Sequence, residues 1–231
     1  MSARSAARRH RDEVGEVLAV HTDRPGPFVV AGFVAVWLLF SGLTLLNSAE
    51  SLVLTLAPAV VFAVLFALVL LYVSGERLIV CERGLVLGSV APGLRPSVIR
   101  YEQIVPGSLV PVTGARRYAA ETGTGGFPQS TVRRSAWTRH GIHFVGPSPK
   151  DARRHNALLA PLQDPPPRSV DRRWVWFAGT GPTPPEQVTA RIAQAAGASG
   201  ADPLARATAA APVRALSGSP ADAAAHLPGL R

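Results

Sequence analysis

The sequence FVVAGFVAVWLLFSGLTLL (28–46) is followed, after a connector of five residues, by LVLTLAPAVVFAVLFALVLLYV (52–73). Neither stretch contains a charged residue, and Glu50 is the one charged residue of the connector. An α-helix rises 1.5 Å per residue, so about 20 apolar residues match a hydrocarbon core roughly 30 Å thick. Helices in the core of a soluble protein rarely lack charge over such a length. We therefore predict two transmembrane helices.

The connector is long enough for a tight turn and little more, so we predict an antiparallel helical hairpin over residues 27–75. Small residues recur at every fourth position of the second helix, at Ala59, Ala63 and Ala67. This spacing lets helix backbones approach closely in lipid, and these three alanines are our candidate helix-packing residues. The alternative is that alanine is simply common in this chain.

Basic residues set the predicted orientation. Residues 1–26 contain five arginines, the turn contains no Lys or Arg, and Arg77 and Arg83 follow the second span. By the positive-inside rule, both termini then lie in the cytoplasm and the turn lies outside. We expect a multi-pass protein of the cell (plasma) membrane, in which residues 1–26 form a basic cytoplasmic tail.

The remaining chain is strongly basic. The net charge is +9, and residues 76–197 contain 16 basic and eight acidic residues. A single cysteine, Cys81, excludes an intramolecular disulfide and fits a reducing cytoplasm. Arginines occur as four adjacent pairs in this region: Arg116 and Arg117, Arg133 and Arg134, Arg153 and Arg154, and Arg172 and Arg173.

The pattern of residues 76–197 is mainly that of β-strands. Short β-prone runs occupy 77–81 and 85–88, with a Glu-Arg-Gly turn between them that predicts a hairpin. Further strands are expected at 97–105, 130–137, 141–145 and 173–178, and a helical turn at 156–162.

A helix is predicted to close this domain. Thr183 and Glu186 have the spacing of a capping box, and proline follows at the first helical position. Val188, Ile192 and Ala195 form one apolar face. Residues 198–231 are rich in Ala, Pro and Gly, and we expect them to form a disordered tail.

The order of these elements resembles that of bacterial membrane proteins that join a two-helix hairpin to a pleckstrin-homology-like (PH-like) domain. The segments that carry the resemblance are ERLIVCERGLVLG, VIRYEQI and WVWFAGTGPTPPEQVTARIAQA. The resemblance implies a membrane α-hairpin plus a mainly-β cytoplasmic domain, in which a PH-like barrel at 76–197 is capped by its C-terminal helix. It also implies a binding or assembly module rather than an enzyme.

The residues give little sign of catalytic chemistry. His140 and His143 have no Asp, Glu or Cys at ligand spacing, and a spacing of three on a strand points the two rings to opposite faces. The segment Gly123-Thr124-Gly125-Gly126 lacks the Gly-Lys-Ser/Thr of a phosphate loop. We expect no enzymatic activity, no cofactor and no metal site.

Two functions remain open. The first is a membrane-anchored interaction module whose arginine pairs contact anionic lipid headgroups or a protein partner at the cytoplasmic face, where each basic residue adds about 1 kcal/mol of attraction. The alternative is an accessory or regulatory subunit of a larger membrane complex, packed through its hairpin. Nucleic-acid binding has little support, because a membrane tether limits access.

Overall fold

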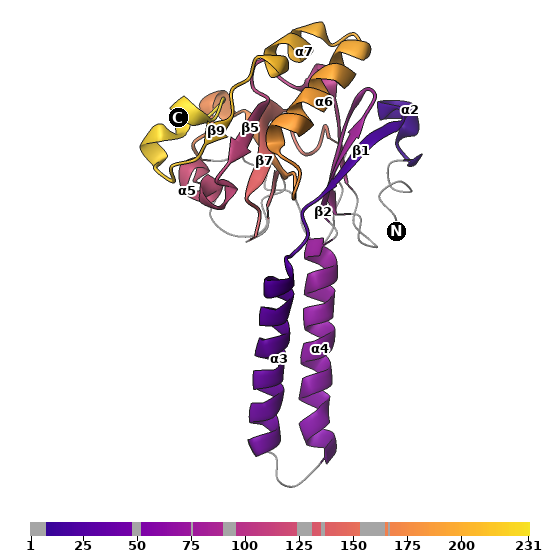
Figure 1. The fold of residues 1–231 in the computed structure, drawn as a ribbon, viewed down its shortest axis with the longest axis vertical. Coiled ribbons are helices and arrows are strands. Elements are labelled where there is room, and N and C mark those ends of the chain that lie inside the picture. The colour runs from indigo at the N-terminus through magenta and orange to yellow at the C-terminus, as the bar shows by residue number, and fades with distance from the viewer. Residues whose placement is uncertain are drawn as a thin grey trace.

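The computed structural model of the 231-residue chain describes residues 8–47, 52–74, 76–89, 96–123, 131–134, 137–152, 165 and 167–231. Two long helices stand side by side below a domain of mixed helices and strands (Figure 1). The helices are α2 (Arg11–Val14), α3 (Pro27–Asn47), α4 (Leu52–Ser74), α5 (Tyr118–Thr122), α6 (Pro185–Ala198), α7 (Asp202–Ala209) and α8 (Ala223–His226). Short 3-10 helices are η1 (Tyr101–Gln103), η2 (Ala115–Arg117), η3 (Val170–Arg172) and η4 (Pro220–Asp222).

The long helices α3 and α4 cover the two uncharged stretches and contact each other through aromatic side chains. The rings of Phe33 and Phe66 lie 5.8 Å apart, as do those of Phe40 and Phe62. The Trp37 indole donates a hydrogen bond to the Ala59 carbonyl at 3.1 Å. Among the described side chains, Pro27–Thr44 is long and apolar enough to cross a membrane, and Ala57–Val69 of α4 is a shorter apolar stretch.

The first sheet contains β1 (Val17–Thr22), β2 (Glu76–Cys81), β3 (Gly84–Ser89) and β4 (Ser97–Arg100), in that order and all antiparallel. The predicted hairpin at β2 and β3 is confirmed. Strand β1 was not predicted, because residues 1–26 were expected to form a tail. Its partner β2 lies beyond the long helices in sequence, with Val20 opposite Ile79, so no local pattern reveals the pairing.

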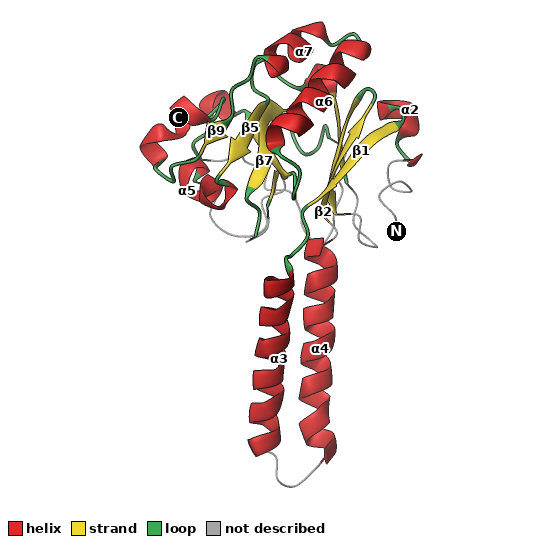
Figure 2. Ribbon diagram, viewed as in Figure 1, coloured by secondary structure: helices red, strands yellow, loops and turns green. Residues whose placement is uncertain are grey.

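The second sheet has the order β6-β8-β7-β5-β9. Figure 2 shows its strands β7, β5 and β9 beside one another. Its strands are β5 (Val110–Thr113), β6 (Val132–Arg133), β7 (His140–Gly146), β8 (Trp174–Gly179) and β9 (Arg214–Ala215). The strands predicted at 141–145 and 173–178 are confirmed as β7 and β8. Of the strand expected at 130–137, the described residues 131–134 and 137 contain the two-residue β6, and the helical turn expected at 156–162 lies outside the described residues.

The strand predicted at 97–105 is too long. It ends at Arg100, where the chain turns into η1 and the Gln103 side chain accepts a hydrogen bond from the Arg100 backbone N–H at 2.9 Å. Tyr101 then becomes a core residue, and its hydroxyl donates to the Cys81 carbonyl at 2.7 Å.

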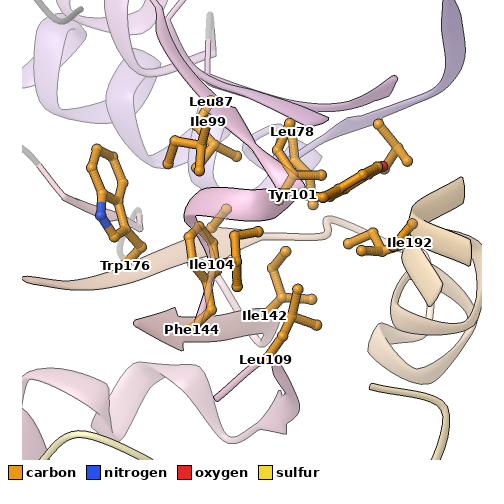
Figure 3. Close-up of a cluster of buried hydrophobic side chains, with 14 of the residues drawn as sticks. Leu78, Leu87, Ile99, Tyr101, Ile104, Leu109, Ile142, Phe144, Trp176 and Ile192 are labelled. Atoms are coloured by element: carbon orange, nitrogen blue, oxygen red, sulfur yellow. The ribbon is translucent and has the colours of Figure 1, made fainter. Parts of the chain in front are cut away.

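The two sheets and α6 share one hydrophobic core (Figure 3). Leu78, Leu87 and Ile99 come from the first sheet, Phe144 and Trp176 from the second, and Ile192 from α6. Within the described residues, the strands form two separate sheets, so the closed barrel that we expected is not observed.

Helix α6 is confirmed, but its predicted capping box is wrong. Pro185 is the first helical residue, and Pro184 at the N-cap makes no side-chain capping bond. The Thr183 hydroxyl instead lies 3.2 Å from Nδ1 of His21 in β1. Val188, Ile192 and Ala195 are buried in the core as predicted.

The C-terminal segment is ordered, which corrects the prediction of a disordered tail at 198–231. Leu204 anchors α7 in the main core, while Leu216, Leu227 and Leu230 are buried in a second cluster against the five-stranded sheet. Strand β9 pairs with β5, with Arg214 opposite Val112. The composition of this segment suggests disorder, because the few leucines that dock it are widely spaced among small residues.

Candidate functional site

The candidate site is the domain base, which we define as Asp23, Arg24, Glu76, Arg77, Arg133, Trp137 and Thr138. Asp23 and Arg24 lie between β1 and α3, and Glu76 and Arg77 begin β2 directly after α4. Both connections to the long helices therefore pass through this surface (Figure 1). A residue here lies where the domain meets the helix pair.

Asp23 fixes the chain where it leaves β1. The Thr138 hydroxyl donates to its carboxylate, and the Trp137 indole N–H donates to its backbone carbonyl at 3.3 Å. Gly179 packs so closely that a Cβ there would lie 2.8 Å from Asp23 Oδ2. Burial raises the pKa of Asp23, the Thr138 hydrogen bond opposes this shift, and the nearby Glu76 charge adds to it.

Glu76 and Arg133 form a largely buried ion pair. Arg133 Nη1 lies 3.0 Å from Glu76 Oε1, and the two side chains are 8% and 14% exposed. Glu76 belongs to β2 and Arg133 to β6, so the pair joins the two sheets at the domain base. Both charged groups are therefore largely inaccessible to an external ligand.

Arg24 and Arg77 supply the accessible positive charge of the domain base. Arg24 is exposed. Arg77 is half-buried opposite Thr22 in the β1–β2 ladder, and its guanidinium donates to the Glu76 carbonyl at 2.9 Å. Burial lowers the pKa of Arg77, and the positive charge of Arg24 lowers it further, while Glu76 opposes the shift. Two positive charges held close together repel each other, and an anion bound next to both would relieve this repulsion.

Of the predicted arginine pairs, the structure brings Arg116–Arg117 and Arg133–Arg134 next to each other, but most of these side chains are engaged within the chain. Arg117 donates to the Ser217 carbonyl at 3.1 Å, and Arg134 donates to the Arg116 carbonyl at 3.3 Å, so both guanidinium groups hold the fold. Arg133 is buried with Glu76. Arg172 and Arg173 are exposed, and Arg153 and Arg154 lie outside the described residues.

Arg24 and Arg77 were not among the site residues that we predicted from the sequence. Their positions carry the signal, because they are the basic residues nearest to the two uncharged stretches at the ends that join the domain. Pairing in sequence was the poorer guide, since an arginine can serve a carbonyl or a carboxylate of its own chain as readily as an external anion.

The predicted helix-packing alanines divide between two environments. Ala59 and Ala63 are half-buried, and the Ala59 carbonyl accepts the bond from Trp37 of α3. Ala67 is exposed, as are Ala31 and Ala35 of α3. Of the three predicted alanines, Ala59 and Ala63 therefore help to pack α4 against α3.

Of the two histidines considered for a metal site, His140 is half-buried at the start of β7 and His143 is enclosed in the core. His143 is fully buried, with Nδ1 2.8 Å from the Tyr118 hydroxyl and Nε2 2.8 Å from the Pro228 carbonyl. Because Nε2–H must donate to the carbonyl, Nδ1 accepts from Tyr118. Among the residues that the structure describes, no three His, Cys, Asp or Glu side chains are grouped as metal ligands.

The glycine segment considered as a phosphate loop is described at Gly123 alone, which ends α5 with φ 68°. Cys81 is fully buried, and burial raises the pKa of its thiol to about 12, with Glu82 and Glu16 adding to the shift. A thiol in this state is a core side chain.

Comparison of the chain with protein-family models, with curated proteins and with solved structures finds no match.

Proposed function

We propose that this protein is a non-enzymatic, membrane-anchored interaction module. In this proposal α3 and α4 form a transmembrane hairpin, and the β domain lies at the cytoplasmic face with its base against the headgroups. The single observation that carries the proposal is Pro27–Thr44, an uncharged helical stretch of membrane-spanning length with 0% of its residues buried. In water, an exposed apolar surface of this size would promote aggregation.

The domain base supports the proposed orientation. Arg24 and Arg77 lie within a few residues of the helix ends. In the proposed orientation they would lie at the depth of acidic headgroups. The half-buried Trp137 is held at the same level by its bond to Asp23, and tryptophan favours membrane interfaces. We propose that these groups bind anionic lipid, in place of the arginine pairs first considered.

The PH-like expectation is supported by part of the architecture. Mostly antiparallel short strands are followed by the amphipathic helix α6, whose apolar face enters the core between the sheets. From that resemblance we keep the proposal that the domain is a binding module. Within the described residues, its two sheets do not close into a barrel.

Fractionation tests the membrane anchor. The full-length chain is expected to remain in the membrane pellet after alkaline carbonate and to be released by detergent. Recovery in the soluble fraction without detergent would overturn the proposal.

Lipid retention tests the role of the domain base. The full chain, purified in mild detergent, is expected to carry anionic lipid, and the variant Arg24→Gln/Arg77→Gln is expected to retain several-fold less, since each charge contributes about 1 kcal/mol. The control variant Arg191→Gln/Arg206→Gln removes two exposed charges from α6 and α7. Equal loss from both variants would refute a specific role for the base.

A second candidate, an accessory subunit of a membrane complex, is favoured by the exposed small residues of the helix pair. Ala31, Ala35 and Ala67 offer close approach to a partner helix. Crosslinking in native membranes separates the candidates. One dominant crosslinked partner that is lost on Ala31→Leu/Ala35→Leu would favour the subunit.

A further inference from the structure

We infer that Arg116, Arg134 and Arg139 form a binding site for a phosphomonoester group, such as a lipid headgroup that ends in a free phosphate. The site rests on the proposed function for the orientation of the domain, and it adds to the domain base a second anion site separate from Arg24 and Arg77.

Backbone hydrogen bonds bring two of these arginines together at one end of the five-stranded sheet. Strand β5 ends beside the start of β7. The chain turns at Gly114, with φ 70°, and the Ala115 N–H then donates to the Arg139 carbonyl at 3.0 Å. Arg116 is the next residue of η2, so it lies beside Arg139. Both arginine side chains are exposed.

Arg134 reaches the same place from the end of β6. Successive residues of an extended chain point to opposite faces, so Arg133 turns to Glu76 of the first sheet and Arg134 turns to η2. Arg134 Nη1 donates to the Arg116 carbonyl at 3.3 Å. This bond uses one nitrogen of a guanidinium that has five N–H donors, so the group can also bind an anion.

The three arginines lack an acidic partner within the part of the chain that the structure describes. No ion pair of the described residues includes any of them. The nearby Glu121 is buried and accepts from the Gly218 N–H instead. Residues 124–130 and 135–136, which adjoin α5 and Arg134 in sequence, contain no Asp or Glu. The positive charge of this cluster is therefore left for an external anion.

A phosphomonoester fits this cluster better than other anions. The planar guanidinium of arginine matches phosphate oxygens with paired hydrogen bonds. A phosphomonoester carries a charge of about −1.5 to −2 at pH 7 and three strong acceptor oxygens, so each guanidinium has an oxygen to bind. A phosphodiester or a single carboxylate offers fewer terminal oxygens and less charge.

The site lies at the end of the sheet that faces the membrane in the proposed orientation. Arg139 directly follows Thr138, whose hydroxyl donates to Asp23 between β1 and α3. Figure 1 shows β7 and α5, the helix that follows η2, in the half of the domain nearer the helix pair. A lipid headgroup is therefore the nearest source of a phosphomonoester, and a soluble metabolite is the other source.

The test offers the full chain, in dodecylmaltoside micelles, phosphatidic acid and phosphatidylglycerol at equal concentration. Phosphatidic acid ends in a phosphomonoester, whereas phosphatidylglycerol is a phosphodiester with the same acyl chains. Native mass spectrometry is expected to find about fivefold more bound phosphatidic acid, and Arg116→Gln/Arg139→Gln is expected to abolish this preference. Arg116→Lys/Arg139→Lys keeps the charge without the planar fork and should lose most of the preference. The control Arg191→Gln/Arg206→Gln removes two exposed charges elsewhere and should keep it.

A soluble source is tested with glycerol 3-phosphate, titrated into the lipid-free chain by calorimetry. Binding that Arg116→Gln/Arg139→Gln abolishes, without a preference between the two lipids, would support the site and assign it to a soluble phosphomonoester. A preference for phosphatidic acid with weak binding of glycerol 3-phosphate would support the site and assign it to lipid.

Several results would overturn the inference. These are equal binding of the two lipids without binding of glycerol 3-phosphate, equal effects of the site and control variants, or tighter binding of a glutamate-rich peptide than of either phosphomonoester. Arg24→Gln/Arg77→Gln keeps these outcomes apart from failure of the proposed function. That variant is expected to lose both lipids alike and to keep the preference, so an unchanged amount of bound lipid would count against the domain base and not against this site.

Discussion

Arg133 Nη1 lies 3.0 Å from Glu76 Oε1, and this ion pair joins the two sheets of the domain where β2 leaves the helix pair. Because both side chains are largely buried, removal of one partner leaves an uncompensated charge in a poorly solvated site. The pair therefore links the start of β2, next to the helix pair, to both sheets of the domain.

Glu76→Gln is expected to lower the free energy of unfolding by about 3 kcal/mol, whereas Glu76→Gln combined with Arg133→Met recovers most of that loss. The measurement is denaturant unfolding of the full chain in detergent. The exposed Arg11–Glu16 pair supplies the control, and Glu16→Gln should change stability by less than about 1 kcal/mol. Comparable losses from Glu76→Gln and Glu16→Gln would contradict the structural role of the buried pair.

Buried His143 predicts acid sensitivity. Burial lowers its pKa from 6.5 to about 4, with the Pro228 hydrogen bond opposing the shift. As the pH falls, the imidazole of residue 143 is therefore protonated in the unfolded chain before it is protonated in the folded chain. The stabilising contribution is complete above pH 6.5 and is lost as the pH falls from 6.5 to 4, at about 1.4 kcal/mol per pH unit.

Unfolding free energies measured at pH 7 and pH 4.5 check this prediction. The native chain should lose about 3 kcal/mol more than His143→Leu over this interval, although the variant starts from a lower stability because Tyr118 and Pro228 lose their partner. An unchanged pH slope in His143→Leu would show that other groups control the acid response.

Glu121 is predicted to hold the C-terminal segment in place. It is fully buried, and its Oε1 accepts from the Gly218 N–H at 2.9 Å and the Ser217 hydroxyl at 3.3 Å. Glu121→Ala should cost about 1–3 kcal/mol and accelerate tryptic cleavage after Arg214. Glu102→Ala, at an exposed position, is the control. Unaltered cleavage in Glu121→Ala would mean that the leucine contacts alone dock the segment.

Substitution of two exposed leucines tests whether α3 lies in lipid. The 12 Leu, Val and Phe residues of the span 28–46 favour insertion by roughly 5 kcal/mol. Leu39 and Leu43 are 61% and 48% exposed. Leu39→Arg/Leu43→Arg should oppose insertion by about 6 kcal/mol and shift the chain out of the carbonate-resistant membrane fraction. Val213→Arg in the domain should leave the fractionation as it was, and an equal shift there would point to general misfolding.

Features encoded locally were predictable from the sequence. The long apolar stretches, the β2–β3 hairpin and the buried face of α6 follow from residue periodicity alone. Strand β1 and the C-terminal segment were missed because their partners are distant in sequence, as Val20 is from Ile79. The partners of two of the predicted site residues could not be read from the sequence for a related reason. Arg117 and Arg133 look like free charges in sequence, and only the fold shows the carbonyl and carboxylate that they bind.

Labelling of intact cells with a membrane-impermeant maleimide tests the transmembrane hairpin most directly. The native chain provides a silent background, because Cys81 is fully buried and burial raises the pKa of its thiol to about 12. Glu50→Cys, between the two helices, is predicted to be labelled in intact cells, and Ala210→Cys in the domain only after permeabilisation. Labelling of Ala210→Cys from outside, with Glu50→Cys protected, would contradict the proposed topology.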